Sequence, residues 1–306
     1  MAYGGDQLKE INKLLTLNLR IICRKILETI PKVRAIYVIC GFSRGESSVM
    51  IQNGEIKILS DIDLLVITDA PQFLSLIKLK KLKKELSTYK FFNIEIMEGH
   101  PVVEIEILSN DMIQKIPPCL FTYELKTAKC IYGVDMLDLF KKLNPNKISV
   151  RDGFRLLFDR MLGALIPFSI DLTDSKLEST KSRHLMFETS KLITACRDAI
   201  LILNGIYFPT EKQRQRYFRE NWSNKFTEIR QEIPWLLEIS EIAHSYRLKP
   251  DERLERLSLN LWYKATYCAC KIITIYLHKL YRIKGTTYDD VISTFIKRTF
   301  YPPSYK

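Results

Sequence analysis

Residues 36–68 read IYVICGFSRGESSVMIQNGEIKILSDIDLLVIT, and the interpretation of the chain starts from this stretch. An apolar run ends in a turn rich in small residues, and SDID then opens a second apolar run. In a strand, residues two apart share a face, so Asp61 and Asp63 are expected to converge while Ile62 and Leu64 point into the core. Carboxylates held this close repel each other, and a divalent cation with oxygen ligands is the usual compensation.

The bulk properties are those of an ordinary globular protein. The chain has 306 residues, which suggests two domains, with 46% apolar and 27% charged residues. No apolar run approaches the roughly 20 residues that span a bilayer, and the N-terminus lacks the pattern of a signal peptide. The 7 cysteines are scattered and form no C-x-x-C pair, which favours reduced thiols. We therefore expect a cytoplasmic protein with no membrane partner.

The net charge of +12 is unevenly distributed along the chain. Residues 1–142 carry 20 Lys and Arg against 17 Asp and Glu, whereas the remainder carries 27 against 18. A basic surface favours polyanionic partners such as nucleoside triphosphates, nucleic acid or an acidic protein. Solubility alone is an equally reasonable explanation for a charge of this size.

Hydrophobic periodicity and turn residues predict a mixed first half and a helical second half. Asn53-Gly54 is a strong two-residue hairpin signal, Glu98-Gly99-His100 indicates a second hairpin, and Ser109 can cap a helix. Strands are expected at 33–40, 49–52, 55–59, 61–68, 91–97 and 101–108, and helices at 6–30, 41–46, 71–88, 110–116, 121–129, 135–142, 149–166, 176–204, 211–231, 234–247, 251–282 and 287–299.

The change of pattern also predicts the domain boundary. Asn144-Pro145-Asn146 is the best linker candidate, and beyond it the patterning is helical nearly throughout. We expect an α+β protein in which residues 1–143 form a domain around a mixed β-sheet. Residues 144–306 are expected to form an all-α helical bundle.

A third carboxylate would complete a metal site with the two aspartates. Residues 103–107 read VEIEI, a strict alternation that places Glu104 and Glu106 on one face of a strand. A solvent-facing edge strand shows the same pattern, so the alternation alone decides nothing. Three converging carboxylates can hold one or two Mg²⁺ ions for phosphoryl or nucleotidyl transfer, and one of them can take a proton from an attacking hydroxyl.

Several other residues have chemistry suited to phosphate. The glycine turn at 41–45 lets backbone N–H groups approach a phosphate, and Arg44 is either a phosphate contact or one half of a structural ion pair. Lys181, Arg183 and Lys191 lie on a predicted helix and could neutralise a triphosphate. Their alternative role is that of ordinary solvated charges.

The order of these motifs resembles a known family. A strand, the turn CGFSRGE at 40–46 and then SDIDLLV at 60–66 resemble the DNA polymerase β-like nucleotidyltransferase superfamily. That group includes aminoglycoside nucleotidyltransferases, CCA-adding enzymes and the small nucleotidyltransferases of prokaryotic toxin–antitoxin loci. Cys40 and Ser43 stand where a related form of the turn has glycines. The spacer before the aspartates is longer than usual, and the hairpin at Asn53-Gly54 accounts for the excess.

The resemblance extends beyond the aspartates. Residues 102–108 resemble the strand that bears the third carboxylate in aminoglycoside adenylyltransferases, which favours Glu104 over its neighbour Glu106. Residues 123–125 and 131–133 resemble the segment that closes the nucleotidyltransferase domain, and residues 195–207 resemble the helical domain more loosely. The specific match covers about the first 140 residues.

The resemblance implies a Mg²⁺-dependent nucleotidyltransferase that releases pyrophosphate. Asp61, Asp63 and Glu104 would bind the metal and carry the catalysis. The nucleotide would be held by Gly41, Ser43, Arg44 and Lys191. ATP is the default donor, and the acceptor hydroxyl belongs to a small molecule, a protein or an RNA.

Two other readings stay open at this point. The fold could be retained as a catalytically silent binding module, for example a component of a toxin–antitoxin pair with a partner protein. The chain could also bind nucleic acid through its basic helices alone, which would give steep salt dependence and indifference to loss of Asp61.

Overall fold

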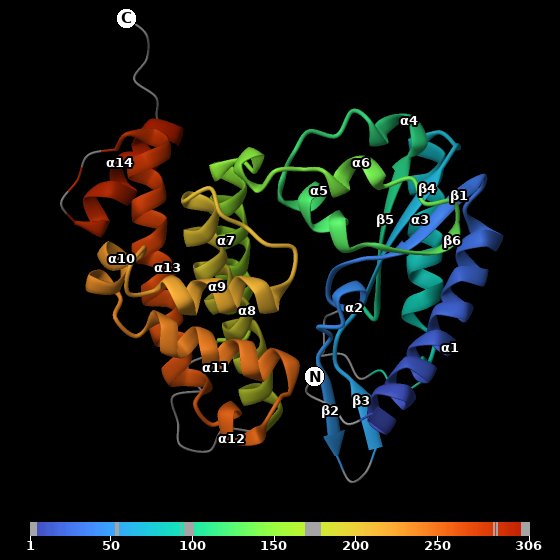
Figure 1. Cartoon of the computed structure of the whole chain (residues 1–306), viewed down its shortest axis with the longest axis horizontal. Coiled ribbons are helices and arrows are strands. Elements are labelled where there is room, and N and C mark those ends of the chain that lie inside the picture. The colour runs from blue at the N-terminus through green and yellow to red at the C-terminus, as the bar shows by residue number, and fades with distance from the viewer. Residues whose placement is uncertain are drawn as a thin grey trace, which may run out of the picture. The chain divides into compact units, whose positions relative to one another are not determined.

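The structure is a computed structural model in which two compact units are distinguished. The first comprises Met1–Leu143 and Arg247–Pro250, and the second comprises Asn144–Tyr246 and Asp251–Lys306. The chain is mixed α+β, and every regular element described in the second unit is helical (Figure 1). The residues that the structure describes are 5–52, 55–92, 94, 101–168, 179–283, 285 and 287–300.

The first unit is built on a four-stranded sheet with the order β5-β4-β1-β6, beside a separate ribbon of β2 and β3. Strand β1 runs antiparallel to β4 and β6, whereas β4 and β5 are parallel. The strands are β1 Val33–Val38, β2 Val49–Gln52, β3 Glu55–Ile58, β4 Ile62–Thr68, β5 Val103–Ser109 and β6 Lys129–Gly133. The helical elements are α1 Gly5–Thr29, α2 Cys40–Arg44, α3 Gln72–Ser87, α4 Asn110–Ile113, α5 Leu120–Glu124, the 3-10 turn η1 Leu125–Thr127 and α6 Asp138–Lys141.

Both faces of the sheet are covered, which explains why β4 is apolar at nearly every position. Leu64 and Val66 pack on the side of α1 and α3, whose apolar residues repeat at helical spacing. Leu65 and Ile67 point to the opposite side, where residues of α4, η1 and α6 cover them. Figure 1 shows α1 and α3 together on one face of this sheet. A strand buried on both faces cannot carry a polar residue except at its end.

Strand β5 lies at the edge of the sheet, and a side chain from α3 hydrogen-bonds to its open edge. Gln72, the first residue of α3, donates from Nε2 to the carbonyl of Ile107 at 2.9 Å. Its Oε1 accepts from the backbone N–H of Ser109 at 3.0 Å. These two bonds occupy backbone groups on the open edge of the strand, where no further strand is paired among the described residues.

The first predicted hairpin is confirmed in its strands, because β2 and β3 pair antiparallel with Gln52 opposite Glu55. Its turn, Asn53-Gly54, lies outside the described residues. The second predicted hairpin, between residues 91–97 and 101–108, is not seen among the described residues. Residue Ile94 forms a parallel bridge with Ile58 of β3, and β5 pairs with β4. Glu98-Gly99-His100 lies outside the described residues.

Two shorter predictions in this unit were wrong in detail. The helix expected at 121–129 ends at Thr127, and the chain continues as β6, which pairs with the second edge of β1. Ser109 precedes α4 as its N-cap residue, but its side chain makes no capping hydrogen bond. Residues 129–133 hydrogen-bond to backbone groups on the second edge of β1, and this pairing outweighs their local helical propensity.

The second unit is a group of helices packed around α8. The predicted single helices at 211–231 and 251–282 are each divided in two. After Asn221 the chain turns so that Trp222 and Phe226 reach Phe218, with ring centroids at 4.9 and 5.1 Å. The helices are α7 Val150–Leu165, α8 Ser179–Leu203, α9 Glu211–Asn221, α10 Thr227–Glu232, α11 Leu236–Leu248, α12 Glu252–Glu255, α13 Ser258–Tyr281 and α14 Tyr288–Phe300, preceded by the 3-10 turn η2 Pro145–Lys147.

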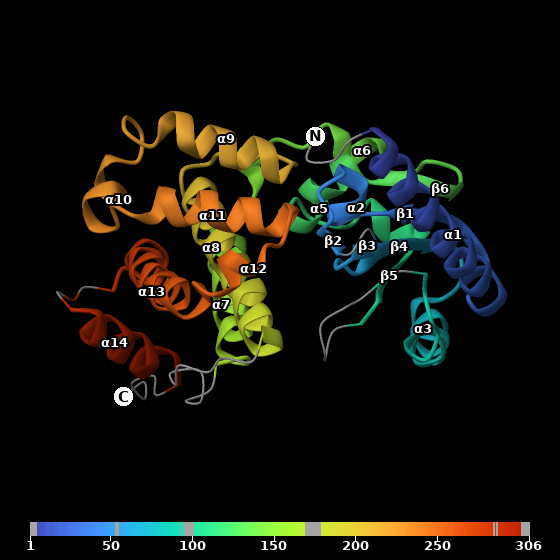
Figure 2. The ribbon, with the colours of Figure 1, turned by 90° about the horizontal axis from the view of Figure 1, so that it is seen from below.

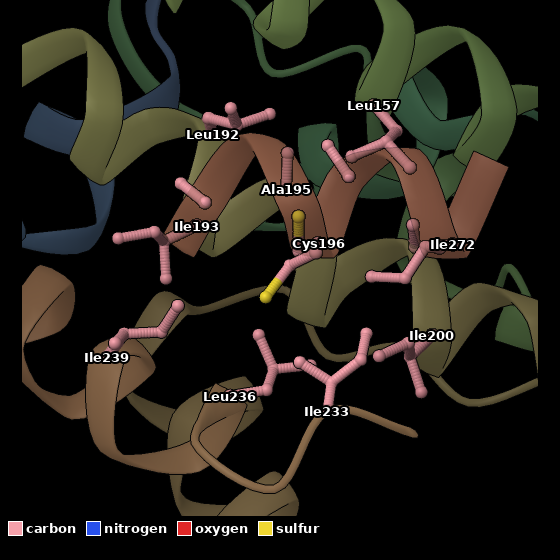
Figure 3. Close-up of a cluster of buried hydrophobic side chains, with 14 of the residues drawn as sticks. Leu157, Leu192, Ile193, Ala195, Cys196, Ile200, Ile233, Leu236, Ile239 and Ile272 are labelled. Atoms are coloured by element: carbon pink, nitrogen blue, oxygen red, sulfur yellow. The ribbon is translucent and has the colours of Figure 1, made fainter. Parts of the chain in front are cut away.

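One hydrophobic core joins these helices. Helix α8 packs against α7 and α13, and α14 packs along α13 (Figure 2). Figure 3 shows Cys196 and Ile200 of α8 among side chains that include Leu236 of α11 and Ile272 of α13. Within the described residues, no helix combines the length and the apolar character needed to span a bilayer. All seven cysteines of the chain are free thiols.

The second unit also buries an ionic network. Arg197 of α8 is completely buried and donates to Asp198, Glu211 and Gln215 over distances of 2.6 to 2.9 Å. Glu211 also lies 3.2 Å from the imidazole of His244. A buried guanidinium is tolerated only when carboxylates and other acceptors surround it, so this network ties α8 to α9.

Candidate functional site

The two aspartates stand at the start of β4. Asp61 directly precedes the strand and Asp63 is its second residue, and both side chains are partly exposed. Ile62 and Leu64 are completely buried in the core beneath α1 and α3. The opposite orientation that the strand period predicts for the acidic and apolar residues is therefore confirmed.

Glu104 reaches the aspartates from the neighbouring strand. It pairs with Asp63 in the parallel ladder of β4 and β5, so the two side chains stand beside each other. One carboxylate oxygen from each of Asp61, Asp63 and Glu104 lies within 4.8 Å of the others. Glu106 falls beside Leu65 and is exposed. The structure thus brings Glu104 to the aspartates and leaves Glu106 outside this group.

The electrostatics of the group centre on Asp63. Burial, together with the charges of Asp61 and Glu104, raises the pKa of Asp63 to about 7. A hydrogen bond from the Cys40 thiol and the positive charge of Arg44 act in the opposite direction. Neighbouring carboxylates at this distance disfavour the ionised form of Asp63, and a bound cation would favour it.

The donor set suits a hard cation. The three carboxylates supply only oxygen ligands, which Mg²⁺ and Mn²⁺ prefer, and among the described residues no imidazole or thiolate belongs to the group. The residues present therefore fit a divalent metal of this class. Lys83 of α3 lies 3.7 Å from Glu104 and contributes a positive charge on the outer side of the site.

The small-residue turn forms the short helix α2. Its first residue, Cys40, has a φ of +55°, and Gly45 after it has a φ of +71°. A residue with a Cβ costs about 1–2 kcal/mol in this left-handed region, whereas glycine adopts it readily. The related form of this turn has glycine where this chain has Cys40, and a positive φ at that position explains why glycine suits it. At Gly41, by contrast, an added Cβ would meet its nearest atom at 3.7 Å, an ordinary contact, so packing does not require glycine there.

The side chains of the turn point to partners inside the chain. Ser43 is 3% exposed, and its hydroxyl donates to the carbonyl of Cys40 at 2.9 Å. Arg44 is also largely buried, pairs with Glu46 at 2.8 Å and lies 3.9 Å from Glu124. Of the two roles considered for Arg44, the structure shows the ion pair. The phosphate contacts of Ser43 and Arg44 stay predictions.

The basic residues of α8 belong to the second unit. Lys191 pairs with Glu188 at 2.8 Å and lies over the ring of Phe187, 4.2 Å from its centroid. Arg183 pairs with Glu255 at 2.9 Å. Lys181 is exposed. The triphosphate contact predicted for Lys191 stays a prediction.

Sequence reasoning missed two neighbours of the carboxylates. Cys40 was noted only as a departure from glycine, and Lys83 was assigned to a solvated face. A usable signal existed for Cys40, because the strand that it follows was expected in the same sheet as the strand that Asp63 opens. No signal pointed to Lys83, whose position depends on how α3 packs along β5.

Comparison with protein-family models and with curated proteins finds no match to this chain. The case for a function therefore rests on the residues themselves: the three carboxylates, the turn at α2 and their placement in one sheet. These features are local to the first unit.

Proposed function

We propose that this protein is a Mg²⁺-dependent nucleotidyltransferase, which moves a nucleoside monophosphate from a nucleoside triphosphate to a hydroxyl group and releases pyrophosphate. The observation that carries the proposal is the convergence of Asp61, Asp63 and Glu104 within 4.8 Å at the end of one sheet. The resemblance of the turn and of SDIDLLV to polymerase β-like nucleotidyltransferases supports it, and ATP is the default donor on that basis alone.

The three carboxylates would hold the metal. Bound Mg²⁺ would supply positive charge to the phosphate oxygens and the attacking hydroxyl. Asp63, whose pKa is raised to about 7 by burial and its acidic neighbours, would be fully ionised at neutral pH only with such a counter-charge present. Asp61 would complete the aspartate pair from the residue before the strand.

Glu104 is the residue we assign to proton transfer. Its side chain is 45% exposed on an edge strand, so an acceptor can approach it from solvent. The hydroxyl oxygen of the acceptor forms a bond to the α-phosphorus as the bond to pyrophosphate breaks, and the hydroxyl proton passes to the Glu104 carboxylate. The acceptor is a small molecule, a protein side chain or an RNA end.

The turn at α2 would contact the phosphates through its backbone. The Ser43 hydroxyl and the Arg44 guanidinium already have partners within the chain, so backbone N–H groups near Gly41 are the better candidates. Neither crowding nor a positive φ accounts for glycine at position 41, and the close approach of a ligand to the backbone would account for it. The contact expected of Lys191, a residue of the second unit, stays a prediction from the sequence.

A catalytically silent module is the second candidate, and one observation favours it. The polar side chains of the turn, Ser43 and Arg44, are turned towards partners inside the chain. A protein that kept the fold only to bind a partner, such as the second component of a toxin–antitoxin pair, would show the same arrangement. Such a protein would keep its partner affinity when the aspartates are replaced.

The test is nucleotide labelling with the full chain. The protein is incubated with each of the four α-labelled nucleoside triphosphates, Mg²⁺ and a cell extract that is then separated into RNA, protein and small molecules. Label transfer should be lost in the Asp61→Ala/Asp63→Ala variant and fall by about 100-fold or more in Glu104→Gln, because general-base catalysis is worth that much. Glu106→Gln is the matched control and should resemble the wild type.

Either of two results would count against the proposal. If no labelled product depends on the aspartates, the protein is not an enzyme of this class. If Glu106→Gln loses as much activity as Glu104→Gln, the third carboxylate has been assigned wrongly. The fraction that takes the label identifies the class of acceptor.

A further inference from the structure

An open pocket of about 900 Å³ lies between α10 and α13 of the second unit. These two helices lie beside each other in both views of the chain (Figure 1, Figure 2). The walls of the pocket combine apolar side chains, such as Ile229 and Ile275, with charged ones, and every lining residue belongs to the second unit. Known ligand sites have volumes of about 300–1,000 Å³, so the pocket is large enough to hold one.

Two lysines of the pocket have only uncharged acceptors among the described residues. Lys225 donates to the hydroxyl of Tyr217 at 2.7 Å. Lys279 donates to the carbonyl of Leu203 at 2.9 Å. Neither acceptor neutralises the ammonium group that it holds. Both lysines therefore keep a positive charge that an anionic ligand can meet.

The acidic residues of the pocket do not cancel this charge. The lining residues include 3 lysines and 2 glutamates, which leaves a net charge of +1 with the histidine neutral. Glu232 is paired with Lys271 at 3.3 Å and not with the two lysines above. The pocket also lies in the more basic part of the chain, because residues 143–306 carry 27 Lys and Arg against 18 Asp and Glu. A surface of this kind attracts polyanions.

The face of α13 that leads to the pocket carries two exposed tyrosines. The side chains of Tyr263 and Tyr267 are 54% and 45% exposed. Residues 263, 267 and 271 follow at intervals of four, so their side chains lie on one face of the helix. The Lys271 ammonium lies 5.7 Å from the centroid of the Tyr267 ring, and Lys271 also lines the pocket. The tyrosines and the pocket therefore form one continuous surface.

This combination of groups matches one class of polyanion. Proteins that bind single-stranded nucleic acid join a positively charged groove, which follows the phosphates, to aromatic side chains on which bases stack. Two exposed rings one helical turn apart can take successive bases. An acidic peptide would use the lysines but has no planar groups for the rings, and a duplex keeps the faces of its bases covered.

We propose that the surface formed by Tyr263, Tyr267, Lys225, Lys271 and Lys279 binds single-stranded nucleic acid. Its phosphates lie against the lysines of the pocket, and its bases stack on the two tyrosines. The inference goes beyond the proposed function and does not rest on it, because the surface belongs to the second unit and includes none of the three carboxylates.

The experiment measures the fluorescence anisotropy of a labelled oligouridine with the full chain in EDTA, so that metal-dependent binding at the carboxylates does not contribute. An oligonucleotide of about 12 nucleotides falls within the site sizes of folds that bind single strands. Tyr263→Ala and Tyr267→Ala should each weaken binding by about fivefold or more, because a stacked base contributes at least that much. Tyr267→Phe keeps the ring and should bind as the wild type does. Tyr132→Ala is the matched control, since Tyr132 is 43% exposed on β6 of the first unit.

Salt dependence tests the lysines. Lys225→Gln and Lys279→Gln should each weaken binding and lower the slope of log Kd against log salt concentration by about 0.7, the value for one phosphate contact of a single strand. Lys115→Gln removes the same charge from an exposed residue of the first unit and should leave the slope unchanged.

The outcomes separate this inference from its rivals. If Tyr263→Ala and Tyr267→Ala bind like Tyr132→Ala, or if a duplex of the same length binds as tightly as the single strand, the inference is wrong. If polyglutamate competes as well as the oligonucleotide and the tyrosine variants are unaffected, the surface fits an acidic protein instead. If the variants behave as expected but no nucleotide is transferred in the labelling experiment, the nucleic-acid surface stands and the proposed function fails.

Discussion

Replacing Asp63 by asparagine should stabilise the protein in the absence of metal, although it should also abolish the proposed activity. The pKa of Asp63 is raised, because burial and the adjacent Asp61 and Glu104 penalise its charge. Asparagine has nearly the same shape and carries no charge, so it removes the repulsion and keeps the packing. A site built to bind a cation is expected to reduce the stability of the fold that carries it.

The size and the pH dependence of the effect follow from the pKa. An unfolded aspartate loses its proton near 3.8, whereas folded Asp63 holds it to about 7. Between these values the folded state binds more protons than the unfolded state, so the wild type loses stability as the pH rises and levels off above 7. The difference corresponds to about 4 kcal/mol in full, and we expect Asp63→Asn to gain about 2 to 4 kcal/mol at pH 8. At pH 4 the gain should be close to zero.

Urea unfolding in EDTA at pH 4, 6 and 8 measures this gain. Glu106→Gln is the control, because it removes an exposed carboxylate from the same face of β5 and should show no such pH dependence. Addition of Mg²⁺ at pH 8 should stabilise the wild type and leave Asp63→Asn unchanged. An Asp63→Asn variant that is no more stable than the wild type at pH 8, or that gains equally at pH 4, would refute the reasoning.

Three further predictions concern other parts of the chain. Lys83→Ala should tighten Mg²⁺ binding by up to about fivefold at low salt, because an exposed ion pair is worth at most about 1 kcal/mol, and calorimetry in about 1 M NaCl should find no difference. Gly153→Ala should lower the free energy of unfolding by about 1–3 kcal/mol, since the new Cβ would lie 2.2 Å from the hydroxyl of Tyr276. An unchanged urea midpoint would show that the helices can separate to admit it. Glu211→Gln should cost about 3–5 kcal/mol at pH 7, because Arg197 lowers the pKa of Glu211 well below its usual value despite burial. The wild type loses this contribution as the pH falls below 4.5, so the two urea curves should converge in acid and a constant difference would contradict the assignment.

Strands β1 to β5 were predictable because the residues of each strand specify it locally, whereas β6 was not expected. The alternation in SDIDL gave the two faces of β4, and the Asn53-Gly54 signal gave the pairing of β2 with β3. Both depend on neighbours within a few residues in sequence. The buried state of Ile62 and Leu64 follows from the same period.

The predictions that were wrong or left open concern features that depend on residues far away in the sequence. The alternation in VEIEI places Glu104 and Glu106 on the same face of the strand. Only the parallel register of β5 beside β4 shows that Glu104, and not Glu106, lies beside Asp63. That register joins strands from separate parts of the chain, and no local pattern specifies it. The split of the helix predicted at 211–231 depends on the cluster of Trp222 and Phe226 with an aromatic residue of α9, which periodicity does not reveal.

The end of β5 bears on how this site could change over time. Strand β5 repeats its pattern every two residues, but a shift by two that brought Glu106 beside Asp63 would also put Ser109 beside Val66, in the core position that Ile107 now fills. The choice of glutamate is therefore tied to the point where the apolar run of β5 ends. A lineage that replaced Ser109 by an apolar residue would weaken this tie, and its third acid could then be reassigned without rebuilding the sheet.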